Sequence, residues 1–277
     1  MTDKLPNSEV CHSGGEHSYC EVDNEVWDDE VDLVAVGAGP AGLACAIAAA
    51  DADLDVIVAR PPDSARPEPA GTAHGWLPRR DDPATAAYFE ALGDELPVIE
   101  APELAMRNAY TPGRVDTGRR AQVETFVGAR LWDWAARCLG SPYGVMFTRV
   151  AYWPTVAMRT MGGSAIEVAT LAEVTSGGRT LTAWLDELAA DRNIEVTADS
   201  TLHRIVFGED DRIAGVVLDT PDGPWAVRAR VGVAVTADHV ELSEMPLDPG
   251  GRISLVGQRA ARFGRLEVLR EVEPPES

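Results

Sequence analysis

The sequence is almost without lysine, and basic side chains of any kind are few. Of the 277 residues only Lys4 is a lysine, and the formal net charge at pH 7 is −21. A surface with this charge repels nucleic acid and anionic lipid, and it favours solubility. The composition therefore argues against a nucleic-acid-binding function, and we expect no nucleic-acid partner.

Long apolar runs are also absent. No stretch reaches the roughly 18 or more apolar residues that a helix needs to span a membrane. The polar, acidic N-terminus lacks the basic and then apolar order of a signal peptide. We therefore expect a cytoplasmic protein without a membrane span.

Cysteine is scarce, which argues against a disulfide framework. The four cysteines are Cys11, Cys20, Cys45 and Cys138. The first two lie with His12 and His17 in a polar segment, and two Cys with two His can bind zinc. Their order matches no common zinc module. We therefore interpret residues 1–29 as a flexible acidic tail and expect no metal.

The clearest motif is a glycine turn between an apolar strand and a helix. Val31 to Val36 is an apolar run typical of a buried parallel strand, and an alanine-rich helix follows the turn and ends at Ala50. The turn is Gly37-Ala38-Gly39-Pro40-Ala41-Gly42. In a dinucleotide-binding fold the first glycine permits the tight turn, the second the approach of a diphosphate, and the third close packing of helix and strand. The helix N-terminus then offers amides and partial positive charge to an anion.

The second strand, expected from Asp55 to Ala59, lacks the acidic residue that usually follows it. In such folds Asp or Glu accepts hydrogen bonds from the adenosine ribose, and losing them costs roughly 1.5–3 kcal/mol. Arg60 stands at that position here. Arg60 can accommodate a 2′-phosphate, which would indicate NADP, or Asp63 can fold back onto the ribose. The sequence does not choose between these alternatives.

The remaining pattern alternates helices with short strands and predicts an α/β protein. Expected helices cover residues 82–93, 121–139 and 179–191, and expected strands cover residues 194–197, 202–207, 213–218, 225–230 and 231–236. A further helix is predicted from Gly257 to Arg270.

Three segments, in the same order along the chain, carry a resemblance to a known family. They are Trp27 to Ala44, then Gly75 to Pro78 with Asp81-Asp82-Pro83, and then Ser176 to Leu181 with its helix and the hairpins to Arg230. They resemble fumarate-reductase-type flavoproteins, the group that includes the 3-ketosteroid dehydrogenases. The resemblance implies FAD as cofactor. It also implies a Rossmann-like FAD-binding domain with a β-meander insertion and a reduced, mixed substrate-side region.

The resemblance also implies a division of the chain and further cofactor contacts. The tail would be residues 1–29, the FAD-binding domain residues 30–93 and 176–240, the reduced substrate or cap region residues 94–175, and the C-terminal segment residues 241–277. Beyond the glycine turn and Arg60, the implied contacts are Thr72, Ala73, His74 and Gly75 in a loop facing the cofactor, the Leu202 backbone at the adenine, and Thr236 with Ala237.

The chain departs from the family where a strand should end in Ala-Thr-Gly-Gly against the cofactor. The matching stretch is Val235-Thr236-Ala237-Asp238, so both glycines are replaced. An aspartate beside a diphosphate or flavin would repel it, and side chains would crowd the close approach. The stretch from Asp94 to Gly178 is too short for the full cap of the family. No catalytic residue can be assigned.

Other polar and aromatic residues have two interpretations each. His74 can contact the flavin or act as a general acid, but a loop histidine without a proton-transfer role is favoured. Tyr152, Trp153 and Arg159 can line a substrate pocket, but ordinary core and surface roles are favoured. His239 follows Asp238, although one such pair of neighbours does not make a catalytic dyad.

The leading hypothesis is an FAD-binding oxidoreductase domain that transfers hydride between the flavin and a carbon–carbon bond next to a carbonyl. Its small-molecule substrate would be steroid-like, or an enoyl or dicarboxylate compound. A second hypothesis is a non-catalytic homologue that acts as a partner or regulatory subunit, with a protein partner or a homo-oligomer. A third is an NADP-binding reductase, which Arg60 motivates.

Overall fold

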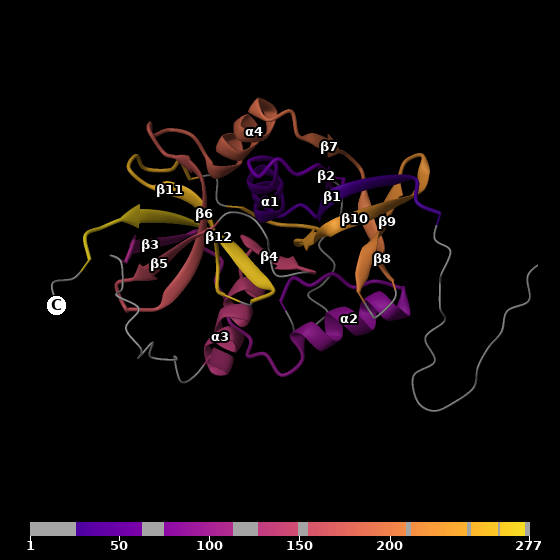
Figure 1. Ribbon diagram of the computed structural model, residues 1–277, viewed down its shortest axis with the longest axis horizontal. Helices are drawn as coiled ribbons and strands as arrows, with labels where there is room; N and C mark the ends of the chain where they lie inside the picture. Colours follow the sequence, from indigo (N-terminus) through magenta and orange to yellow (C-terminus); the bar gives the residue numbers. More distant parts are fainter. Residues whose placement is uncertain are drawn as a thin grey trace, which may run out of the picture.

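The computed structural model describes residues 26–62, 75–112, 127–148, 155–208, 212–242, 245–259 and 261–274 (Figure 1). The helices are α1 (Pro40–Ala50), α2 (Pro83–Gly93), α3 (Val127–Leu139) and α4 (Leu181–Asp191). The first six strands are β1 (Asp29–Val36), β2 (Val56–Ala59), β3 (Ala105–Tyr110), β4 (Gly144–Phe147), β5 (Val156–Thr160) and β6 (Ala165–Glu173). The others are β7 (Glu195–Thr197), β8 (Thr201–Phe207), β9 (Ile213–Thr220), β10 (Gly223–Val235), β11 (Arg252–Gly257) and β12 (Phe263–Glu271).

A parallel sheet in the order β10-β1-β2-β7 forms the Rossmann-like part, as the sequence predicted. Val36 at the end of β1 pairs with Val235 of β10 on one side and Ala59 of β2 on the other. The carboxyl ends of these three strands therefore lie together. In open α/β sheets, ligands bind beyond this edge.

Helices lie on both sides of the fold: α1 packs on β1 and β2, whereas α2 packs on β8 and α3 packs on β4 and β12. Figure 1 shows α1 and α4 on one side and α2 and α3 on the other. Ten of the 11 residues of α1 are buried, because its alanines let β1, β2 and α4 approach closely. The two sides have separate cores, one containing Ile47 of α1 with Leu185 of α4 and the other containing Phe89 of α2 with Trp134 of α3.

The β-meander insertion is present as β8, β9 and β10, which pair antiparallel in sequence order. Trp27 packs on this layer against Val206, Val217 and Ala226. The long strand β10 leaves the meander and ends in the Rossmann-like sheet, so its last residues reach the edge where β1 and β2 end.

The substrate-side region is built mainly of strands. The strands β3, β5, β6, β11 and β12 pair in a closed ring in which β12 contacts both β3 and β11. Strand β4 joins the ring to the Rossmann-like sheet, since it pairs with β12 and with β10. The segment after residue 241 thus pairs with strands of region 94–175.

The helix predicted from Gly257 to Arg270 is wrong. That segment contains the end of β11 and most of β12. Phe263, Leu266 and Leu269 recur every three residues, a spacing that suggests a helix face. Strand β12 is instead buried along both faces between its neighbours, and a strand buried in this way shows no alternation of apolar and polar residues.

One carboxylate is fully buried in this region. Glu267 of β12 has no exposed surface and is held by Arg107 of β3 at 2.7 Å and by Arg265 at 2.6 Å. The Arg265 guanidinium also lies 5.3 Å from the centre of the Trp134 ring. These contacts compensate the charge of Glu267 where water cannot.

No helix within the described parts of the chain is long and apolar enough to cross a membrane.

Candidate functional site

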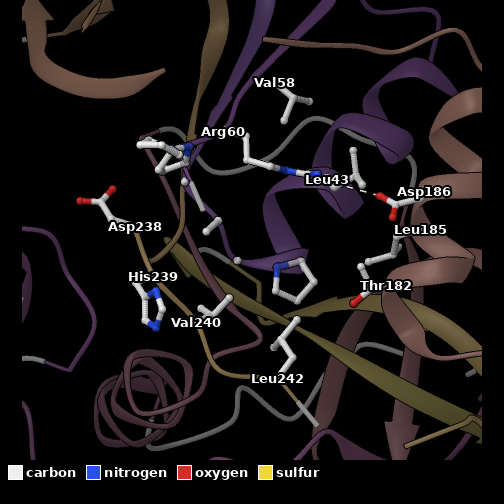
Figure 2. A pocket seen from close by; sticks show the side chains of 16 residues that line it. Leu43, Val58, Arg60, Thr182, Leu185, Asp186, Asp238, His239, Val240 and Leu242 are labelled. Carbon is white, nitrogen blue, oxygen red and sulfur yellow. Dashed lines mark ion pairs between the residues drawn. The ribbon is translucent and has the colours of Figure 1, made fainter. Parts of the chain in front are cut away.

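A cavity of about 250 Å³ lies beyond the carboxyl ends of β1 and β2, beside the glycine turn (Figure 2). The turn contributes Gly37, Ala38, Gly39 and Pro40, and the end of β2 contributes Arg60, Pro61 and Pro62. Helix α4 contributes Thr182, Leu185 and Asp186, and the bend after β10 contributes Asp238, His239, Val240 and Leu242. Leu43 and Val58 also line it.

The glycines of the turn are needed for packing against the end of β10. A Cβ atom on Gly37 would lie 2.4 Å from Thr236 Oγ1, and one on Gly39 would lie 2.8 Å from Thr236 Cβ. Gly37 also has a φ of +116°, which side chains rarely permit. The second glycine therefore lets Thr236 pack against the turn, and its expected approach to a diphosphate stays a prediction.

Two amides of the turn are already hydrogen-bonded within the protein. The Gly39 amide donates to Thr236 Oγ1 across 3.1 Å, and the Ala38 amide donates to the Ala237 carbonyl across 2.7 Å. Thr236 Oγ1 in turn donates to the Val36 carbonyl. Thr236 and Ala237 therefore support the turn, and neither of them lines the cavity.

The N-terminus of α1 borders the cavity without a compensating acid. Gly39 is the N-cap residue and offers no side chain, Pro40 begins the helix, and the first turn holds no acidic residue. The partial positive charge of the helix end is thus left for a ligand. The amides of Asp238 and His239, in the bend opposite, also have no acceptor among the described residues. This edge of the cavity suits an anion.

Arg60 extends from the end of β2 across the cavity towards α4. Its backbone is fixed by bonds to the Thr197 carbonyl and from the Ser200 amide. Its guanidinium lies 3.9 Å from Asp186, with 38% of the Arg60 side chain and 54% of the Asp186 side chain exposed, and Figure 2 shows this pair beside Leu43. An exposed pair at this distance is weak, so Arg60 remains available to a phosphate.

Asp238 does not stand as an isolated negative charge. Both of its carboxylate oxygens contact Arg80 at 2.8 Å. Figure 2 shows the carboxylate directed away from Arg60. The repulsion expected from an aspartate at this position is therefore offset by a partner that the sequence did not suggest.

The structure separates some of the predicted site residues. Leu202 is 2% exposed within β8 and does not line the cavity. Gly75 also lies outside the cavity: a Cβ atom there would lie 2.2 Å from the Leu139 carbonyl oxygen, so this glycine lets the loop pack on the end of α3. Thr72, Ala73 and His74 lie outside the described residues.

The remaining candidate residues also differ in whether they line the cavity. His239 lines the cavity, whereas Arg159 donates to the Gly163 carbonyl across 2.8 Å and braces the turn between β5 and β6. Tyr152 and Trp153, and the cluster of Cys11, His12, His17 and Cys20, lie outside the described residues. Within the described ranges no group of three or more His, Cys, Asp and Glu side chains could hold a metal ion.

Sequence reasoning missed the contributions of α4 and of Arg80. Thr182 and Asp186 are four residues apart on α4, so they share the helix face beside the one that carries Leu181 and Leu185. That spacing was a usable signal. For Arg80, the only signal was a pair of adjacent arginines in a strongly acidic chain.

These residues fit FAD through the predicted helix end and Arg60, and through bend amides that the sequence did not suggest. The open helix end, the bend amides and Arg60 give the cavity donors and positive charge, and the two aspartates that also line it, Asp186 and Asp238, each lie beside an arginine. A volume of about 250 Å³ lies just below the range of roughly 300–1,000 Å³ common for ligand sites. The cavity therefore suits one section of a dinucleotide, with the diphosphate beside the glycine turn.

Similarity to solved structures is partial. A 3-ketosteroid-Δ4-(5α)-dehydrogenase from Rhodococcus jostii RHA1 is 18% identical, with 75% of this chain and 46% of that chain covered and a TM-score of 0.31. A geranylgeranyl bacteriochlorophyll reductase-like protein from Thermoplasma acidophilum is 13% identical, with 86% and 56% covered and a TM-score of 0.25. The open form of NikD, an unusual amino acid oxidase essential for nikkomycin biosynthesis, is 14% identical, with 87% and 70% covered and a TM-score of 0.29.

The chain thus spans about half the length of the first two of these proteins. No protein with a curated function matches the sequence significantly. The model of the FAD binding domain family matches residues 32–245, which include the glycine turn, α4 and the bend after β10. This match confirms the flavoprotein resemblance and FAD as the cofactor. The chain belongs to the family of FAD binding domains.

Proposed function

We propose that this protein is a flavin-dependent oxidoreductase that holds FAD at the cavity beside the glycine turn. Its reaction would transfer hydride between the flavin and a carbon–carbon bond next to a carbonyl. The observation that carries the proposal is the position of the cavity. It lies at the carboxyl ends of β1 and β2, inside the segment that matches the FAD binding domain family.

The chain's own residues would bind and orient the cofactor. The helix end at Gly39 and Pro40 and the main-chain amides of the bend at Asp238 and His239 would hold the diphosphate, and Arg60 would face the adenosine side. When bound, FAD supplies the hydride acceptor or donor. The loop residues Thr72, Ala73, His74 and Gly75, the Leu202 backbone, and Thr236 with Ala237 stay proposed contacts from the resemblance.

The substrate would be a small molecule, either steroid-like or an enoyl or dicarboxylate compound. This substrate class follows from the three segments that resemble the fumarate-reductase type. The cytoplasmic location is likewise proposed from the sequence.

Blocking the cavity tests the proposal directly. Thr182→Trp places a large side chain into the cavity from an exposed position of α4, whereas Ala183→Trp places it on the same turn outside the cavity. Purified protein is titrated with FAD, and bound flavin is followed by its visible absorbance. We expect Thr182→Trp to weaken FAD binding by about tenfold or more, a change of about 1.4 kcal/mol, and Ala183→Trp to bind like the wild type. A wild-type chain that carries no flavin and takes up none would refute the proposal.

A second candidate is a non-catalytic partner or regulatory subunit. The hydrogen bonds that occupy the Ala38 and Gly39 amides support it, because they remove donors that a diphosphate would use. Co-purification with a larger flavoenzyme would favour this candidate. Turnover of a substrate by the isolated, FAD-loaded chain would dismiss it.

A third candidate is an NADP-binding reductase. Arg60 supports it, because the guanidinium lines the cavity and, among the described residues, is held only by a long contact to Asp186. This candidate requires tighter binding of NADP than of NAD, and Arg60→Ala should abolish the difference. Equal affinity of the wild type for the two nucleotides would remove its basis.

A further inference from the structure

Arg80 and Asp238 form a two-pronged ion pair at the edge of the cavity. Arg80 Nη1 lies 2.8 Å from Asp238 Oδ2, and Arg80 Nη2 donates to Asp238 Oδ1 across 2.8 Å. Only 11% of the Arg80 side chain and 32% of the Asp238 side chain is exposed. Two parallel bonds between one guanidinium and both carboxylate oxygens form one of the strongest charged contacts in proteins.

The segment that carries Arg80 is anchored at the end of α3. Leu77 is 4% exposed, and the Trp76 indole donates to the Cys138 carbonyl across 2.9 Å. Arg80 Nη1 also donates to the Arg79 carbonyl across 2.7 Å. The anchored segment and the Arg79 carbonyl therefore position the Arg80 guanidinium independently of Asp238.

Asp238 belongs to the same cavity wall as the bend amides. Without a partner, its carboxylate would repel the two negative charges of a diphosphate at the glycine turn. Arg60, which lines the cavity, is directed to Asp186 and not to Asp238. In Figure 2 the Asp238 carboxylate points away from both of these side chains.

We propose that Arg80 is a positioning residue of the FAD site. By pairing with Asp238 it turns that carboxylate out of the cavity and cancels its charge, so that an anionic cofactor can lie beside it. This inference rests on the proposed function. It makes the aspartate compatible with FAD and gives the Trp76–Arg80 segment a part in cofactor binding.

A double-mutant cycle tests the inference, with the full-length wild type, Arg80→Gln, Asp238→Asn and the double variant titrated with FAD. Arg80→Gln leaves an unpaired aspartate and is expected to raise the Kd for FAD about tenfold or more. Asp238→Asn alone is expected to bind within about threefold of the wild type, and so is the double variant, because each lacks the negative charge. The defect of Arg80→Gln is expected to shrink as salt screens the repulsion.

The cycle separates electrostatic positioning from a structural role. Thermal unfolding without FAD records stability, and a structural role would leave the double variant as weak in FAD binding as Arg80→Gln. That result would overturn the inference, as would wild-type affinity in Arg80→Gln. If Arg80→Gln does not fold, Arg80→Lys replaces it: affinity within about threefold of the wild type supports charge cancellation, and a tenfold loss opposes it. A wild type that binds no FAD overturns the proposed function, and the inference with it.

Discussion

The hydroxyl of Thr236 accepts a hydrogen bond from the Gly39 amide across 3.1 Å and so ties the end of β10 to the glycine turn. The same hydroxyl donates to the Val36 carbonyl at the end of β1. Thr236 has no exposed surface. One buried side chain thus fixes the relative position of the turn and the two central strands that end at the cavity.

Two substitutions of Thr236 distinguish the stability contribution of its hydroxyl from that of its side-chain shape. Thr236→Val keeps the shape but leaves the buried Gly39 amide without its acceptor, which costs roughly 1–3 kcal/mol, while the Val36 carbonyl keeps its bond from the Thr236 amide. Thr236→Ser keeps the hydroxyl and loses one buried methyl group, worth about 1 kcal/mol. Chemical denaturation should therefore give Thr236→Val the larger loss of unfolding free energy. A larger loss for Thr236→Ser would show that packing, and not the hydrogen bonds, dominates here.

The glycines of the turn should differ sharply in their tolerance of alanine. Gly37→Ala creates contacts below 3.0 Å with Thr236 and Ala237 at a φ of +116°, and we expect a loss of roughly 1–3 kcal/mol or more. At Gly42 the nearest atom to an added Cβ is Thr236 Cγ2 at 3.4 Å, an ordinary contact. Because alanine favours helices by roughly 1 kcal/mol over glycine, Gly42→Ala should be neutral or stabilising. Thermal unfolding of the two variants checks this, and similar losses would contradict it.

The buried carboxylate of Glu267 should be essential to stability. Glu267→Gln leaves Arg107 and Arg265 without their buried partner, and removing one member of such a group costs roughly 3–5 kcal/mol. Glu271 on the same strand forms an exposed pair with Arg252, so Glu271→Gln should change stability by only about 0–1 kcal/mol. Urea denaturation measures both variants. Equal losses of unfolding free energy in the two variants would mean that the contacts of Glu267 with the two arginines do not stabilise the fold as the structure indicates.

Acid should remove part of the stability through Asp32. The hydrogen bond from Arg230, followed by the backbone bond from Asp55, lowers the pKa of Asp32 below its ordinary value of 3.8, although partial burial opposes the shift. A carboxylate whose pKa is lower in the folded state stabilises the fold above its unfolded pKa, and this stability is lost as the pH falls through the folded value. Asp32→Asn should therefore be less stable than the wild type near neutral pH, with the gap closing below pH 3.8.

Unfolding curves at several pH values check this expectation. Asp248→Asn, at an exposed position where the described part of the chain offers the side chain no hydrogen-bond or ion-pair partner, provides the control and should follow the wild-type pH profile. A constant gap between Asp32→Asn and the wild type across the acid range would contradict the assignment of the pH dependence to Asp32.

The local pattern predicted the unit from Val31 to Ala59 because its strand, turn and helix depend on neighbouring residues. The cavity at that turn followed from the parallel order of β1, β2 and β10. The Arg80–Asp238 pair could not be predicted, since 158 residues separate the partners and neither has a motif of its own. The role of Gly39 was also hidden, because the group that occupies the space beside it, Thr236, comes 197 residues later.

Strand β12, which belongs to the closed ring of strands, shows a second limit of prediction from local sequence patterns. A fully buried strand has neither the alternation of a half-buried strand nor a polar face, so its apolar spacing resembled that of a helix. Only its pairing with β3, β4 and β11 settles its conformation, and two of these partners, β3 and β4, come from distant parts of the chain.

The pairing of β1 with β10 has a consequence for biosynthesis. Val36 and Val235 are neighbours in the sheet, so the backbone edge of β1 that pairs with β10 stays unpaired until the ribosome has made the intervening chain. Contacts between such distant residues form slowly, and an uncovered strand edge invites aggregation. We expect the yield of folded protein to depend on chaperone supply and on growth temperature more than on the stability of the finished fold.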